Sequence, residues 1–236
     1  MRATLWMFDV AHRVRRFDYD VPTGMRALEA VEHGIRRDLG MQPLVPLGMG
    51  VLDAAPEFLF LVPGGGARQD FTPLGELART DARGFAFYIE VMLGGWSPPT
   101  HDLDVFYFGD TTELAAALAH LVIKGVKRGT TGWLAAANHE GVAIPHVGMV
   151  SIVTDRFGHA LCAIRTESLE QLRFADIGER HAWVEGEGDR TLADWRAGHL
   201  SYFHREATRL GLTFSEDEIV FFEHFRLLAV FGRPDQ

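Results

Sequence analysis

The stretch VEGEGDRTLADWRAGHLSYF, residues 184–203, joins an acidic run broken by glycines to the first half of a long amphipathic pattern. Apolar side chains recur on one helical face between residues 191 and 210, and Gly211 is well suited to end a helix there. Asp189 lies just before this helix, where its carboxylate is a natural N-cap. Glu185 and Glu187 have no such structural task, so we expect them to face a functional site.

A second unusual stretch is LVIKGVKRGTTGW, residues 121–133. An apolar helical pattern runs into Gly125 and is followed by the cations Lys127 and Arg128 and by the hydroxyls of Thr130 and Thr131. Cations near a helix C-terminus are favourable in any case, so a solvated basic turn is one interpretation. The other is that this turn, with Lys124, forms one wall of a ligand site whose opposite wall is residues 185–189.

The composition restricts the class of protein. The chain has 236 residues, 47% of them hydrophobic and 23% charged, as is usual for a folded soluble protein. It contains neither an apolar run of about 20 residues nor a cleavable signal pattern, so we expect a cytoplasmic protein without a membrane segment. Its single cysteine, Cys162, lies in the apolar run ALCAI and is expected to be a buried thiol.

The formal net charge of −9 argues against a protein that coats duplex nucleic acid, because such proteins usually present a basic face. A focused basic pocket on an acidic body is still compatible with this charge, because local potential can differ from net charge.

The chain predicts an α+β protein of two domains, residues 1–100 and 101–236. Residues 94–104, GGWSPPTHDLD, are the best linker because their glycine and proline punctuation breaks either periodicity. The glycine-rich residues 63–66 lack the Lys-Ser/Thr continuation of a phosphate loop and are expected to form a mobile hairpin or loop. Expected helices cover residues 23–39, 112–124, 177–185 and 191–210. Expected strands cover residues 4–10, 44–52, 58–62, 85–93, 147–154, 159–166 and 219–231.

The eleven histidines do not predict a metal site. His199 and His204 are five residues apart on the long helix, and neither H-x-x-x-H nor C-x-x-C pairing occurs. We therefore expect neither a metal nor a cofactor. Trp133 and Trp183 flank the two motifs, where each has two interpretations: stacking on a base or packing in the core.

From about residue 106 onward the chain resembles the ASCH domain family, a branch of the PUA-like β-barrel superfold. The resemblance rests on five blocks in the family's order: FGDTTELAAAL (108–118), GVKRGTT (125–131), VGMVSIVTDRFGHALCAIRT (147–166), VEGEGDRTLADWRAGHLSYF (184–203) and FSEDEIVFFEHFRLL (214–228). The run EGEGDR-(S/T)-L-x-x-W-R is the most specific and resembles a bacterial subfamily. The first hundred residues resemble no family that we can identify.

The resemblance implies an RNA-binding or nucleoside-handling module with a C-terminal PUA-like barrel and flanking helices. Some small members are amidohydrolases of N4-acylated cytidines that use a lysine, a threonine three residues later and a downstream glutamate, and others are ribonucleases. Matched by motif, these residues are Lys127, Thr130 and Glu185, with Glu187 as an alternative carboxylate. The compact members also carry an arginine where this chain has Gly132, which puts transfer of the reaction in doubt.

The chemistry of such a site is consistent with these residue types. Thr130 would attack an amide, Lys127 would accept its proton if burial and the neighbouring Lys124 and Arg128 lowered its pKa, and Glu185 would orient the lysine or protonate the leaving amine. Two classes of function therefore remain open. One is a module that binds RNA or a modified nucleotide through Lys124, Arg128, Thr131, Trp133, Trp183 and Glu187, and the other is a hydrolase.

The unassigned first part carries a further hypothesis. Residues 20–40 are similar to residues 109–125, and later segments follow in the same order about a hundred residues apart, as in a decayed second copy of the domain. This hypothesis requires the two halves to have the same strand order.

Overall fold

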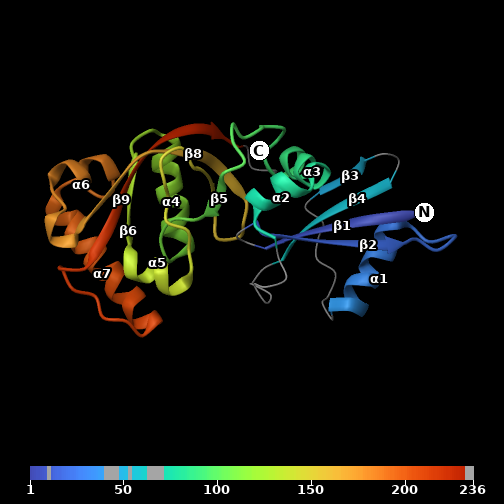
Figure 1. Cartoon of the computed structure of the whole chain (residues 1–236), viewed down its shortest axis with the longest axis horizontal. Helices are drawn as coiled ribbons and strands as arrows, with labels where there is room; N and C mark the ends of the chain where they lie inside the picture. Colours follow the sequence, from blue (N-terminus) through green and yellow to red (C-terminus); the bar gives the residue numbers. More distant parts are fainter. Residues whose placement is uncertain (10–11, 40–47, 53–54, 63–71, 232–236) are drawn as a thin grey trace. The chain divides into compact units, whose positions relative to one another are not determined.

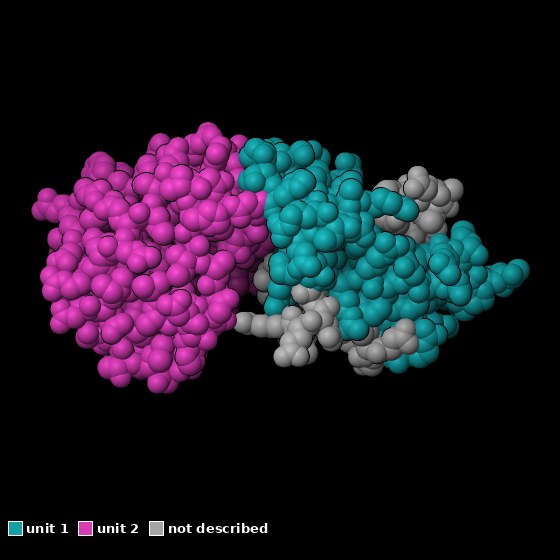
Figure 2. All heavy atoms as spheres, viewed as in Figure 1, with its two compact units in different colours: residues 1–101, 157–159 teal, residues 102–156, 160–236 magenta. Residues whose placement is uncertain are grey.

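A computed structural model describes residues 1–9, 12–39, 48–52, 55–62 and 72–231 (Figure 1). The chain divides into two compact units. Unit 1 contains residues 1–101 and 157–159, and unit 2 contains residues 102–156 and 160–236 (Figure 2). The described helices include none that is long and apolar enough to cross a membrane.

Unit 1 is a four-stranded sheet with helices on both faces (Figure 1). Its strands are ordered β2-β1-β4-β3; β1 pairs antiparallel with β2 and parallel with β4, and β3 pairs antiparallel with β4. Its elements are β1 (Arg2–Asp9), β2 (Val14–Asp20), α1 (Ala27–Leu39), β3 (Gly48–Leu52), β4 (Ala55–Val62), α2 (Leu74–Thr80) and α3 (Ala82–Met92). Side chains of β1 point alternately to the two faces of the sheet, so the strand packs against helices on both faces. On one face Leu5 packs in a cluster with Val31 of α1, and on the other Phe8 contacts Tyr88 of α3.

The strand predicted at residues 85–93 is wrong, because this segment is helix α3. The Asp81 carboxylate caps the helix by accepting the backbone N–H of Gly84 at 2.9 Å. Phe85 and Tyr88 lie one turn apart, are both buried, and stack with their ring centroids 6.4 Å apart. Aromatic residues favour strands on average, but here burial of one helical face decides the structure.

The other predictions for this unit agree with the structure where it can be compared. β1 and α1 are confirmed, although α1 begins at Ala27, four residues later than predicted. Strands are present at β3 and β4. Residues 44–47 of the strand predicted from residue 44, and the glycine-rich residues 63–66, lie outside the described residues.

Unit 2 is a five-stranded sheet ordered β5-β7-β8-β9-β6, in which β5 and β7 are parallel and all other pairs are antiparallel. Its strands are β5 (Leu103–Phe106), β6 (Gly129–Trp133), β7 (Val150–Thr154), β8 (Ala160–Arg173) and β9 (Ile219–Val230). Its helices are α4 (Thr112–Ile123), α5 (Leu134–Glu140), the 3-10 turn η2 (Phe174–Asp176), α6 (Glu179–Glu185) and α7 (Leu192–Leu210). This mixture confirms the predicted α+β class. Among the described strands, no pairing joins the edge strands β5 and β6.

The helices of unit 2 form two separate apolar layers. Val122 of α4 packs in a cluster with Ile164 of β8 and Phe225 of β9, and this cluster also buries Cys162. Burial raises the pKa of the Cys162 thiol to about 12, which confirms a core cysteine. On the other layer, Phe203 of α7 packs with β9. The predicted helices and the β7–β8 hairpin are confirmed in this unit.

The cap of α7 differs from the prediction. Thr191 is the N-cap, and its hydroxyl accepts the backbone N–H of Asp194 at 3.2 Å. Asp189 instead accepts the backbone N–H of Thr191 at 2.8 Å, so it stabilises the turn that leads into the helix.

The duplication hypothesis is contradicted by the strand orders. In unit 2 the strand before the helix, β5, pairs in parallel with β7, the first strand of the following hairpin. In unit 1 the strand before the helix, β2, pairs only with β1 among the described strands, and β1 pairs with β4, the second strand of its hairpin. The two sheets are therefore not copies of one arrangement.

Candidate functional site

The basic turn predicted from GVKRGTT is held by backbone hydrogen bonds to three elements. Gly125 adopts a φ of +70°, and the N–H of Lys127 returns to the carbonyl of Leu121 at 3.1 Å. The N–H of Arg128 donates to the carbonyl of Val184 at the end of α6, and the carbonyl of Arg128 accepts an N–H from β9. The turn is thus fixed between α4, α6 and β9.

Gly186 brings the second motif, EGEGD, against this turn. It ends α6 in the left-handed region with a φ of +69°, where glycine is favoured. A Cβ atom at this position would lie 2.4 Å from the carbonyl oxygen of Val126, so a side chain would separate the two motifs. Glu185 directly precedes this contact and points into the unit.

Lys127 is the centre of the cluster. Its Nζ lies 3.1 Å from Oε2 of Glu185 and 2.5 Å from Oε1 of Glu187. The Lys127 and Glu185 side chains are 0% exposed, and Glu187 is 26% exposed. The Phe108 ring centroid lies 5.2 Å from Nζ and adds a cation–π contact. Since unpaired buried charge is very costly, this ion pair and its hydrogen bonds are required for the lysine to occupy the interior.

The protonation of Lys127 differs from the sequence-based hypothesis. Burial alone would lower its pKa, but Glu185 and Glu187 outweigh that effect, so the pKa of Lys127 is raised. Lys124 and Arg128, which were expected to lower it, are exposed on the surface of the turn. Lys127 is therefore an ammonium donor in this state and not a proton acceptor.

Glu185 has two further partners. Thr131 Oγ1 donates a short hydrogen bond to Glu185 Oε1, and His199 Nε2 lies 3.4 Å from Oε2. Burial raises the pKa of Glu185, but Lys127 and His199 reverse this and hold the pKa far below its usual range. The carboxylate is ionised, and it accepts contacts from all three side chains.

His199 is a site residue that the sequence did not identify. Its Nδ1–H donates to the carbonyl of Trp195 at 3.0 Å, so Nε2 is the nitrogen that titrates beside Glu185. Burial lowers the pKa of His199, but the Glu185 carboxylate raises it by more. The available signal was spacing: His199 falls four residues after Trp195 and four before Phe203, on the predicted inner face of the helix.

Thr130 does not join this cluster. Residues of β6 alternate between its two faces, so Thr130 lies opposite Thr131. Its neighbour in register is Glu223 of β9. Of the three residues predicted to act together, the structure brings Lys127 and Glu185 into contact and leaves Thr130 on the other face of the strand.

Glu223 is the second residue that the sequence did not identify. It is buried in β9, and Thr166 Oγ1 donates to its Oε1 at 2.6 Å. Burial raises the pKa of Glu223, and the carboxylate of Asp104 raises it further. Its position as the lone acid in the apolar-aromatic run IVFFEHF was the available signal. The charge of Lys127 lowers the pKa of both Glu185 and Glu223. The net shifts are nevertheless opposite, because the pKa of Glu185 is lowered overall and that of Glu223 is raised.

Gly132 has a packing reason for lacking a side chain. A Cβ there would lie 2.1 Å from the Phe221 ring, which covers the position on the neighbouring strand. An arginine side chain at this position would therefore collide with the Phe221 ring.

The two tryptophans have different surroundings. Trp133 is 3% exposed, and its ring packs beside those of Phe203 and Phe214 in the core. This favours the packing interpretation and removes Trp133 from the residues able to stack on a base. Trp183 is exposed on α6.

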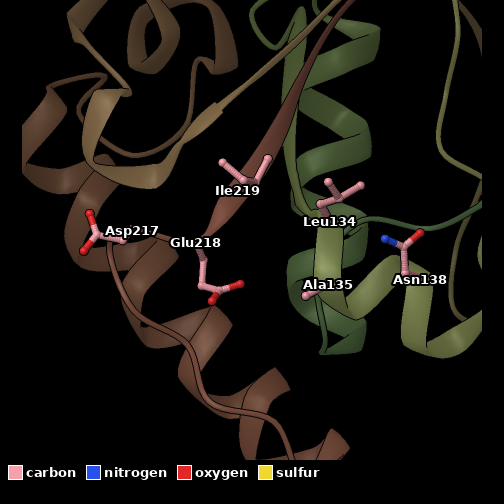
Figure 3. A pocket seen from close by; sticks show the side chains of 6 residues that line it. All are labelled: Leu134, Ala135, Asn138, Asp217, Glu218 and Ile219. Atoms are coloured by element: carbon pink, nitrogen blue, oxygen red, sulfur yellow. The ribbon is translucent and has the colours of Figure 1, made fainter.

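One surface hollow of unit 2 lies away from the Lys127 cluster. Figure 3 shows it between α5 and the start of β9, where its lining residues are Leu134, Ala135, Asn138, Asp217, Glu218 and Ile219. It contains none of the residues predicted for the ligand site and carries two acids, so its chemistry does not suit a nucleotide phosphate. A second hollow surrounds Trp183.

The model of the ASCH domain family matches residues 104–229, more than half of the chain. A crystal structure of an ASCH domain from Lactobacillus crispatus JV V101 is similar, with 29% sequence identity and a TM-score of 0.54 over 61% of this chain and 92% of that chain. A crystal structure of a protein from Enterococcus faecalis V583 has 28% identity and a TM-score of 0.50 over 53% and 76%. No curated protein sequence matches the chain.

The His199–Glu185 contact predicts a pH dependence of stability. The raised pKa means that His199 stabilises the folded state fully below its ordinary pKa of about 6.5. This contribution is lost as pH rises through the folded-state pKa, so the free energy of unfolding should fall above pH ~6.5, by at most ~1.4 kcal/mol per pH unit. His199→Gln should remove this fall, as measured by urea unfolding across a pH series.

His204→Gln is the matched control because His204 is exposed on the same helix, and it should keep the wild-type pH dependence. Burial lowers the pKa of His181, so its effect lies below pH ~6.5 and has the opposite sign. An equal fall in the wild type and in His199→Gln would contradict the assignment.

Proposed function

The chain belongs to the ASCH domain family, and on this premise we propose that unit 2 binds RNA or a modified nucleotide beside the basic turn at residues 124–128. The observation that carries the proposal is the buried contact of Lys127 with Glu185 and Glu187. It ties the basic turn to the EGEGD loop and leaves the cations Lys124 and Arg128 on the surface above it.

The charges suggest how a ligand would enter. Glu187 is the outer, partly exposed partner of Lys127, whereas Glu185 is enclosed. A phosphate or carbonyl oxygen of a ligand would take the place of Glu187 on the ammonium, while Glu185 keeps the lysine in position. Lys124 and Arg128 would contact neighbouring phosphates. The net charge of −9 favours a short segment or a nucleoside-sized ligand over a coated duplex.

A hydrolase is the second candidate, supported by the opposite pKa shifts of Glu185 and Glu223 near Lys127. Carboxyl groups with separated pKa values are typical of acid–base sites. In an amidohydrolase of N4-acylated cytidine-like nucleosides, the Lys127 ammonium would stabilise the developing oxyanion. Thr130 lies beside Glu223 in register, so Glu223 is the nearer carboxyl for its hydroxyl. A ribonuclease would use the same cations on a phosphodiester.

Fluorescence anisotropy with a short labelled single-stranded RNA tests the binding proposal. Arg128→Ala should weaken binding about tenfold by removing one charge-assisted contact, and it should make the salt slope shallower by about 0.7. Arg2→Ala is the control, because Arg2 is an exposed arginine of unit 1. No binding by the wild type, or equal losses in the two variants, would contradict the proposal.

Incubation with N4-acetylcytidine tests the hydrolase separately, with released cytidine measured by chromatography. If the candidate is right, the wild type releases cytidine and Glu223→Gln loses most of that turnover, because glutamine cannot exchange a proton. Asp217→Asn, at an exposed position before β9, should retain turnover. An unchanged rate in Glu223→Gln would remove Glu223 from the reaction, and absence of product from the wild type would reject this hydrolase.

A further inference from the structure

Trp183 is an exposed aromatic side chain next to the EGEGD loop. It is 61% exposed on α6, an unusual position for a large aromatic residue. The guanidinium carbon of Arg190 lies 4.0 Å from the centroid of its ring. Arg190 also donates from Nη2 to the backbone carbonyl of Trp183 at 3.1 Å. With one face of the indole covered by Arg190, an exposure of 61% leaves the other face open to solvent.

The loop holds Arg190 in this place at an energetic cost. Gly186, Gly188 and Arg190 all adopt positive φ values, of +69°, +51° and +68°, so the loop curls back toward α6. A left-handed backbone is strained for a long side chain such as arginine. The Nε of Arg190 is also buried without a hydrogen-bond partner in the described structure. The left-handed backbone of Arg190 and its buried, unpaired Nε are both costs that structural stability alone does not explain.

The hollow around this pair suits a flat, uncharged group. It is lined by Trp183 and Arg190 together with Glu179, Arg180, Asp189 and Leu192. Arg180 forms an ion pair with Glu170 at 2.5 Å, which offsets its charge toward a phosphate. The other charged side chains, Glu179, Asp189 and Arg190, leave a net negative charge that disfavours a phosphate. The open surface that remains is the aromatic face beside an apolar side chain.

The hollow is connected to the basic turn through the backbone. The N–H of Arg128 donates to the carbonyl of Val184, the residue after Trp183. The segment that carries Trp183 is thus joined directly to the turn that carries Lys124 and Arg128, so one nucleic-acid strand could contact both the cations and the aromatic face. Stacking on that face needs an unpaired base, because the faces of bases in a duplex are already covered by their neighbours.

We infer that Trp183, backed by Arg190, is a stacking platform for one base of a single-stranded RNA. The inference rests on the proposed RNA-binding function and restricts it to single strands. The base contact is separate from the phosphate contacts of the basic turn. It therefore contributes affinity without contributing to the salt dependence.

Anisotropy with a labelled single-stranded RNA and with the duplex of the same sequence tests this inference. Trp183→Leu should weaken single-strand binding between about 5- and 150-fold while leaving the salt slope unchanged, because a stacking contact and no phosphate contact is lost. Trp183→Phe should recover much of the affinity. The duplex should bind more weakly than the single strand to the wild type and should be insensitive to Trp183→Leu.

Phe157→Leu is the matched control, because Phe157 is 59% exposed and belongs to unit 1. It should bind RNA as the wild type does, and circular dichroism should show native folding for all variants. Wild-type binding that Trp183→Leu leaves unchanged would overturn the platform while the proposed function stands. A loss in Trp183→Leu that extends equally to the duplex, or a changed salt slope, would also overturn it. Failure of the wild type to bind any RNA would reject the proposed function itself.

Discussion

Burying Lys127 obliges the chain to bring carboxylates to it. An ammonium group without exposure is tolerated only when its charge is balanced and its N–H groups find acceptors, and Glu185 and Glu187 supply the opposite charge and two hydrogen bonds. Those carboxylates reach the lysine because Gly186 lets the EGEGD loop touch the backbone of the basic turn. Glu185 then orders Thr131 and His199. One ion pair therefore determines how α4, α6, α7 and β6 meet.

The same constraint separates the enclosed part of the site from its outer part. Inside, Glu185 is ionised and surrounded by donors, whereas burial raises the pKa of Glu223 on the neighbouring strand β9. Outside, Lys124, Arg128 and Trp183 lie on the surface of elements that the ion pair holds together. A rigid, charge-balanced interior with cations and an aromatic ring outside it is well suited to recognition, because little order has to be created when a ligand binds.

Much of this arrangement could be predicted from the sequence, and the failures have physical causes. The period of residues 191–210 and the order of the motifs led to the correct fold and to Lys127 and Glu185. Which threonine faces Glu185 was not predictable, because a shift of one residue reverses the face of a strand. The pKa of Lys127 depends on its burial and on its contacts with Glu185 and Glu187, and neither can be predicted from the residues next to it in the sequence. The aromatic run at residues 85–93 became a helix because packing outweighed propensity.

A double-mutant cycle on Lys127 and Glu185 tests the central claim most directly, with the free energy of unfolding measured for Lys127→Met, Glu185→Leu and the double variant. Each single change leaves the other buried charge without its enclosed partner and should cost about 3–5 kcal/mol. The double variant removes both charges, so its loss should be far smaller than the sum of the two single losses. Losses that simply add would show that the two side chains do not depend on each other, and the account of the site would be wrong.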